Sequence, residues 1–149
     1  MRWPMWPKIV QINKTDVYVM GGNDSTIENQ FTLNYKVLKC NFQIVLDPAV
    51  LANPEQKLTV YARASMLRPR QAFGICAVNN FIYVGGGVTS SGTYTWTTDR
   101  YDVLNDSWQT LDSCKFPEAL FANSLVAIRK RFIYQFGFSA PYSSSLSKP

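Results

Sequence analysis

NNFIYVGGG, residues 79–87, joins a run of aromatic and β-branched residues directly to three glycines. Such residues favour strands, and consecutive glycines typically end a strand in a turn. Related sequences occur at residues 17–22 (VYVMGG) and 132–137 (FIYQFG). We therefore interpret the chain as an array of repeats, in each of which a strand runs into glycine.

The second and third repeats align without a gap. Residues 81–83 and 132–134 both read FIY at an offset of 51, and the same offset aligns Gly86 with Gly137. Between the first and second repeats the offset is 65, and the extra 14 residues fall between Tyr35 and Arg70, where the sequence DPAVLANP lies at 47–54. An N-cap candidate followed by proline, with a second proline as a stop, predicts one helical turn. We expect an insertion at residues 47–56.

Strand signals recur within each repeat. Period-two patterns and turn residues predict strands at residues 9–13, 17–20, 31–46, 57–64, 72–78, 81–84, 100–104, 107–111, 124–128 and 132–136. Residues 72–78 (AFGICAV) are apolar or small on both faces, so this strand needs cover on both sides. Residues 88–98, rich in Ser, Thr and Gly, are expected to form a loop.

A period near fifty, with four strand signals and a double glycine in each unit, resembles the kelch repeat of β-propellers. The residues that carry the resemblance in the second unit are Arg70, Gly86, Gly87, Tyr101, Asp102 and Trp108. The first unit has Gly21, Gly22 and Tyr35 but no matching tryptophan, and the last has Phe138 in place of its second glycine. The resemblance implies an all-β fold of kelch-type β-propeller blades, each with four antiparallel strands. A generic antiparallel sandwich is the alternative.

The repeats divide the chain into two full units and a partial one. We expect an N-terminal extension, a first repeat, a second repeat, a partial third repeat and a Ser/Pro-rich tail at residues 1–7, 8–68, 69–116, 117–138 and 139–149. Because propellers close with about four to eight blades, we expect an incomplete ring. The remaining blades would come from the same chain or another.

The repeated residues have physical roles that the structure can test. Glycine after the second strand permits positive φ and close approach to a neighbouring segment. This role is expected for Gly21, Gly22, Gly86, Gly87 and Gly137. Tyr101 and Trp108 are large enough to fill the space between one blade and the next.

The composition disfavours several kinds of site. The chain has no histidine, and its three cysteines, Cys40, Cys76 and Cys114, form no CxxC pair. We expect free thiols in a reducing compartment and no metal site. The N-terminus lacks the apolar region of a signal peptide, and no run is long enough to span a bilayer. These features predict a cytoplasmic location, either free or in association with the cytoskeleton or a large complex.

The sequence contains no recognisable catalytic or cofactor-binding motif. GxSxG and HExxH are absent, and the glycines at 85–87 are followed by VTS, without the lysine of a P-loop. Kelch-like propellers include a copper oxidase type whose site requires tyrosine and histidine, so the lack of histidine disfavours this alternative. We expect no enzyme activity and no cofactor.

One end of the predicted blades gathers candidate contact residues. In an up-and-down blade, the loop between strands two and three and the connection to the next blade emerge at the same face. That face would carry Arg68, Arg70, Tyr94, Trp96, Lys115 and Phe116, and arginine and aromatic residues are frequent interface anchors. An acidic or phosphorylated segment would suit it. The competing interpretation is that the arginines pair with neighbouring carboxylates and Trp96 packs on its own loop.

The resemblance implies a non-catalytic protein–protein interaction module or scaffold in a larger protein or assembly, such as a cytoskeletal or ubiquitin-ligase complex. A structural subunit of a cytoskeletal or organellar complex is the alternative. The formal charge is +5, and its only cluster is Arg129-Lys130-Arg131. Between two strand signals, this triplet predicts a solvated hairpin tip rather than a nucleic-acid footprint.

Overall fold

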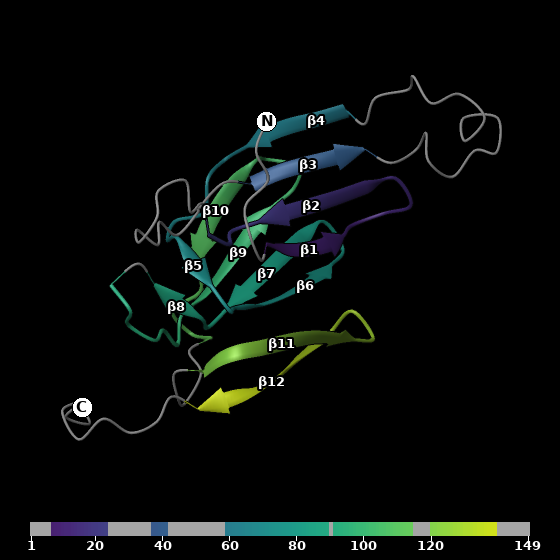
Figure 1. The fold of residues 1–149 in the computed structure, drawn as a ribbon. Helices are drawn as coiled ribbons and strands as arrows, with labels where there is room; N and C mark the ends of the chain where they lie inside the picture. Colours follow the sequence, from purple (N-terminus) through teal and green to yellow (C-terminus); the bar gives the residue numbers. More distant parts are fainter. Residues whose placement is uncertain (1–6, 24–36, 42–58, 90, 115–119, 140–149) are drawn as a thin grey trace, which may run out of the picture.

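The computed structural model describes residues 7–23, 37–41, 59–89, 91–114 and 120–139 (Figure 1). Every regular element in these ranges is a β-strand, and all strand pairs are antiparallel. None of the described residues belongs to a helix that could cross a membrane. The expected all-β fold of antiparallel sheets is therefore confirmed for this part of the chain.

The first sheet has four strands in chain order. They are β1 (Lys8–Gln11), β2 (Asp16–Met20), β3 (Val37–Asn41) and β4 (Thr59–Arg63). Between β1 and β2 the Asn13 side-chain oxygen accepts hydrogen bonds from the backbone N–H groups of Thr15 (2.9 Å) and Asp16 (2.8 Å). Such a bond from asparagine to the following backbone fixes a tight turn, which sets the register of the hairpin.

The second sheet repeats this arrangement. Its strands are β6 (Gly74–Val78), β7 (Phe81–Gly85), β9 (Thr98–Asp102) and β10 (Ser107–Thr110), paired in that order. Two short strands form a separate ribbon at one end, β5 (Arg70–Gln71) and β8 (Val88–Thr89). The prediction of an uninterrupted loop at 88–98 is thus wrong at β8, because a strand of two residues leaves no periodicity to detect.

The third sheet is a long hairpin. β11 (Leu120–Ile128) pairs with β12 (Phe132–Ser139), and the register shifts between Phe121 and Ser124. Both strands are longer than predicted. The shift includes Ala122 at φ 48° and interrupts the alternation on which the sequence-based boundary depended.

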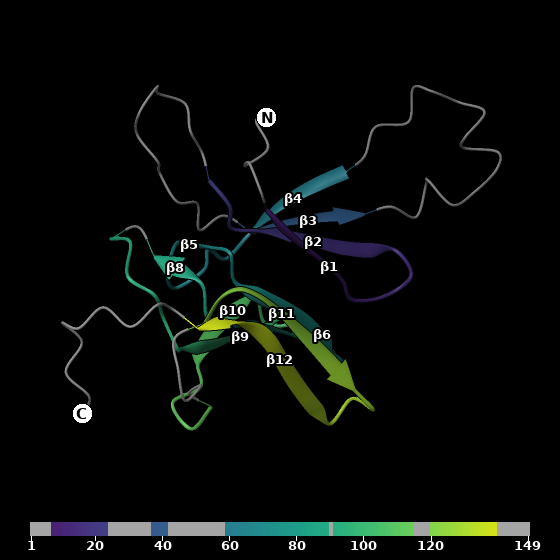
Figure 2. The ribbon, with the colours of Figure 1, turned by 60° about the horizontal axis from the view of Figure 1, so that its bottom comes forward.

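The sheets are stacked, with β6 in the middle of the stack. β6 contacts both β1 and β11, and Figures 1 and 2 show the first sheet on one side of the second and the hairpin on the other. The expected cover on both sides of β6 is therefore found. The described sheets do not close into a ring.

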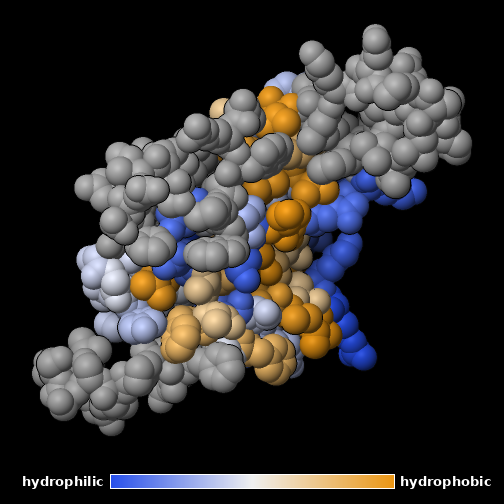
Figure 3. Space-filling model, in the orientation of Figure 1, coloured by the Kyte–Doolittle hydropathy of each residue, from blue (hydrophilic) through white to orange (hydrophobic). Residues whose placement is uncertain are grey.

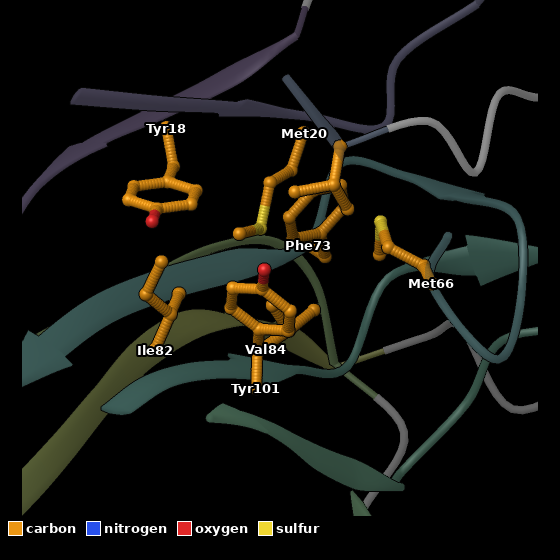
Figure 4. Packing of buried hydrophobic residues seen from close by; sticks show 8 residues of the cluster. Tyr18, Met20, Met66, Phe73, Ile82, Val84 and Tyr101 are labelled. Atoms are coloured by element: carbon orange, nitrogen blue, oxygen red, sulfur yellow. The ribbon is translucent and has the colours of Figure 1, made fainter. Parts of the chain in front are cut away.

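The main core lies between the first two sheets. Figure 4 shows Tyr18 and Met20 from β2 pointing toward Ile82, Val84 and Tyr101 from β7 and β9. Val37, Met66 and Phe73 complete this cluster of buried residues. Phe73 was expected within a strand, but Ala72 before it has φ 53°, so the chain turns there and β6 begins at Gly74.

The double glycines turn where they were expected to turn. The φ angles of Gly21, Gly22, Gly86 and Gly87 are 61°, 91°, 66° and 95°, a region that strongly favours glycine. Gly137 is different, because it stays within β12, and a Cβ added there would lie 2.5 Å from the Cβ of Asn123. Its role is close approach between paired strands and not a turn.

Some predictions fall outside the described residues. The helical insertion at 47–56, the ends of the strand predicted at 31–46, the N-terminal residues 1–6 and the tail from residue 140 are among them. Lys115 and Phe116 lie in the undescribed range 115–119.

Candidate interaction surface

Arg70 is placed inside the protein and not on its surface. Its side chain is fully buried, and its guanidinium donates to the carbonyl oxygens of Gly86 (3.1 Å) and Thr97 (3.3 Å) and to the Asp99 carboxylate (2.5 Å). Gly86 and Thr97 stand at the two ends of the segment that joins β7 to β9, residues 86–97, here called the β7–β9 loop. Arg70 therefore clamps both ends of this loop.

Asp99 receives a second arginine. Arg68 donates to both Asp99 oxygens, at 2.6 and 2.9 Å, and the Thr110 hydroxyl donates to one of them at 2.8 Å. The Asp99 side chain is only 2% exposed. For both arginines, pairing with a neighbouring carboxylate is what the structure shows. Arg68 keeps 35% of its side chain exposed, whereas Arg70 has no surface to offer a partner.

The charge of Arg70 survives its burial. Burial lowers the pKa of the guanidinium to about 10, with the nearby Asp99 opposing this shift and Arg68 adding to it. At neutral pH Arg70 is still a cation, so its ion pair with Asp99 is intact. A buried cation depends on such a partner, because an unpaired charge in this position would be costly.

Backbone hydrogen bonds connect the described residues of the β7–β9 loop to one another. The Thr95 N–H donates to Gly87 O (3.0 Å), and the Gly86 N–H donates to Thr97 O (3.2 Å). Farther out, the Thr89 N–H donates to Thr93 O (3.0 Å). A loop held in this way presents its side chains in fixed positions, which reduces the entropy lost on binding.

Trp96 projects from this ordered loop, whereas Tyr94 does not. Trp96 is 47% exposed, although Thr95 before it is buried. The Tyr94 ring is half-buried and packs on Phe121 of β11, with ring centroids 5.2 Å apart. The structure joins Arg68 and Arg70 through Asp99 and gives Tyr94 and Trp96 different environments. Trp96 and the exposed part of Arg68 remain candidates for partner contact.

Sequence reasoning did not identify Asp99 or Thr97. Both follow a Ser/Thr/Gly-rich segment and look like ordinary loop residues in the sequence. A usable signal was the presence of two arginines close together, Arg68 and Arg70, which require a carboxylate if either is buried.

Tyr101 and Trp108 pack against the first sheet and against Ala64, which follows it in the chain. The Tyr101 ring lies 5.8 Å from that of Tyr18 in the first sheet and 5.1 Å from that of Trp108. The Trp108 indole donates to Ala64 O (2.9 Å), and the Tyr101 hydroxyl donates to Asp106 (2.5 Å). Burial, and then the Asp106 carboxylate, raise the pKa of Tyr101 well above its usual range, so the phenol remains a neutral donor.

The described residues contain no cluster of three or more His, Cys, Asp or Glu side chains that could hold a metal ion. Cys40 and Cys76 are buried free thiols, and Cys114 is an exposed one. Burial raises the pKa of Cys76 to about 11, which keeps it a protonated thiol. The two buried thiols, Cys40 and Cys76, have the character of packing residues.

Comparison with known proteins finds a similar fold at low sequence identity. No family model matches the chain, and no curated protein matches it. Among solved structures, that of YjhT is similar, with a TM-score of 0.60 and 17% sequence identity. The match covers 84% of this chain but only 32% of YjhT, so the chain spans about a third of that protein's length. At this identity the likeness concerns the fold.

Proposed function

We propose that this chain is a non-catalytic interaction module built from kelch-type β-propeller blades. Three features support the blade interpretation: the recurring double glycine with positive φ, the stacking of each sheet on the next, and the Tyr101–Trp108 pair between two of them. The two full sheets and the hairpin correspond to two blades and half of a third. The ring would be completed by further blades of the same or another chain.

The observation that carries the interaction function is Trp96. An exposed tryptophan on a disordered loop loses conformational entropy on binding, but Trp96 stands on a loop fixed by backbone bonds and by Arg70. Tryptophan and arginine are the residues in which interface binding energy is most often concentrated. We therefore propose that the partner contacts Trp96 and the exposed part of Arg68, which shares the Asp99 carboxylate with Arg70. A protein segment with an apolar side chain and an acidic or phosphorylated group fits this pair.

The test is partner capture with matched variants. Immobilised wild-type chain is compared with Trp96→Ala and with Tyr61→Ala, because Tyr61 on β4 is 48% exposed and Trp96 is 47% exposed. Captured proteins are quantified by mass spectrometry. We expect at least one protein whose recovery falls about tenfold or more with Trp96→Ala and is unchanged with Tyr61→Ala. Equal recovery by both variants for every captured protein would contradict a contact at Trp96.

A further inference from the structure

The β11–β12 hairpin exposes one largely apolar face, whose side chains alternate with those that face β6. Its apolar side chains are between 45% and 63% exposed, and they are Val126, Ile128, Phe132, Tyr134 and Phe136. Ser124, which lies opposite Phe136, is an exposed polar residue on the same face. The opposite face is closely packed, because a Cβ added to Gly74 of β6 would lie 2.7 Å from the Leu125 Cγ. A contiguous exposed apolar face of this kind marks an interaction surface.

The tip of the same hairpin is strongly basic. Arg129, Lys130 and Arg131 are all exposed, and the hairpin, residues 120–139, contains no Asp or Glu. Arg129 and Lys130 both have φ 52°, although hairpin turns with positive φ favour Asn and Gly. Non-glycine residues are strained in this region of backbone conformation. Arg129 and Lys130 thus occupy turn positions whose backbone conformation is unfavourable for both residues.

The outer edge of β12 is open where the equivalent edges are paired. In the first sheet β3 pairs with β2, and in the second sheet β9 pairs with β7. β12 is the second strand of its sheet, as β2 and β7 are of theirs. Among the described strands, β12 pairs only with β11. Its sequence, FIYQFGFS, has neither a charge nor a proline to protect the edge.

We propose that a strand from an acidic protein partner pairs with the outer edge of β12 and places a carboxylate beside the basic tip. This inference rests on the proposed interaction function and adds a second contact site to it. The register of the second sheet gives the expected pattern, since Asp102 lies opposite Phe81 and Tyr101 lies opposite Ile82. Phe81 is equivalent to Phe132 at the offset of 51. The partner strand would therefore carry an acidic residue opposite Phe132, preceded by an aromatic or aliphatic residue.

Two other occupants fit the hairpin less well. A second copy of the hairpin would bring three more cations and no carboxylate to the contact. An anionic membrane would neutralise the tip, but hydrocarbon would leave the backbone N–H and C=O groups of the open edge unpaired. A strand satisfies those groups and places its own side chains beside the apolar ones of β12.

A peptide from the chain itself serves as the probe. Residues 98–110, TDRYDVLNDSWQT, form β9 and β10 of the second sheet and contain Asp102 at the required position. Binding of the labelled peptide to the full chain is followed by fluorescence anisotropy. We expect saturable binding that weakens about tenfold or more when Arg129, Lys130 and Arg131 are all changed to Glu. A peptide carrying Asp102→Lys should bind this variant better than it binds the wild type.

Matched controls separate the tip contact from general effects. A peptide carrying Asp99→Lys should not restore binding to the tip variant, because Asp99 lies opposite Val84, three residues farther from the turn. Phe136→Ser should weaken binding, while Tyr61→Ser on β4 should not. Circular dichroism checks that each variant is folded.

Four results would overturn the proposal. They are no peptide binding, binding unaffected by charge reversal at the tip, phosphatidylserine vesicles binding through the tip without peptide binding, and self-association of the chain through the same residues. None of these results bears on the proposed contact at Trp96, because the capture experiment tests that site separately. The two proposals can therefore fail separately.

Discussion

Asp99 is the residue on which the position of the β7–β9 loop depends most. It neutralises Arg70, which is fully buried, and anchors Arg68. Arg70 in turn holds the ends of the β7–β9 loop through two backbone carbonyls. One carboxylate thus connects the charge balance of the interior with the position of the loop that carries Trp96.

Removing this carboxylate should be strongly destabilising. Asp99→Ala leaves the buried Arg70 cation without its partner, a change that typically costs about 3–5 kcal/mol. The free energy of unfolding, measured by urea denaturation, should fall by this order for Asp99→Ala. Asp112→Ala provides the control, because Asp112 is exposed, and should change stability little. Equal stability of the two variants would show that the Arg70–Asp99 pair does not hold the fold.

The burial of Arg70 also shows a limit of sequence reasoning. Arginine is mostly exposed in proteins, so Arg70 was placed on the contact face together with Arg68 and Trp96. The structure connects Arg68 and Arg70 through their shared carboxylate partner, Asp99. The sequence contained no sign of which arginine was buried, because that depends on Asp99, about thirty residues away in the chain.

Within single elements, the turns that end the second strands depend on glycine for a steric reason. Gly87 has φ 95°, and a Cβ added there would lie 2.7 Å from the backbone oxygen of Gln71. Gly92 has φ 74° but nothing within 4 Å of its Cβ position. The two glycines thus share the strained backbone region and differ in the space around them.

This difference gives a direct comparison. Gly92→Ala should cost about 1 kcal/mol, for the backbone conformation alone. Gly87→Ala should cost clearly more, because the added methyl must also displace the β5–β8 ribbon. Thermal unfolding of both variants measures the difference. If both are equally stable, close approach at Gly87 is not what the double glycine provides.

Hairpins were predicted better than the elements around them. The β1–β2, β6–β7 and β9–β10 hairpins combine strand-favouring residues with clear turn residues, and the structure contains all three. β5 and β8 were missed, since their pairing joins two-residue strands that are far apart in sequence. The extent of β11 was underestimated because the irregularity after Phe121 breaks its alternation.

At the scale of the whole molecule, the stack has a well-packed middle and an open end. The second sheet is covered on one side by the first sheet and on the other by the hairpin. Beyond the hairpin, its apolar face is exposed. In Figure 3, hydrophobic residues form a band down the middle of the visible face, and hydrophilic residues lie at the hairpin tips on its right. A molecule of this kind is suited to binding further sheets or strands.

Dye binding to the native chain tests this claim most directly. Anilinonaphthalene sulfonate fluoresces when it binds exposed apolar surface. We expect strong fluorescence with the native chain, under conditions in which circular dichroism and cooperative unfolding show it to be folded. The fluorescence should decrease markedly when Phe132, Tyr134 and Phe136 are changed to Ser. A folded, monomeric chain that binds no dye would contradict this claim, because such a chain would have no open face left to occupy.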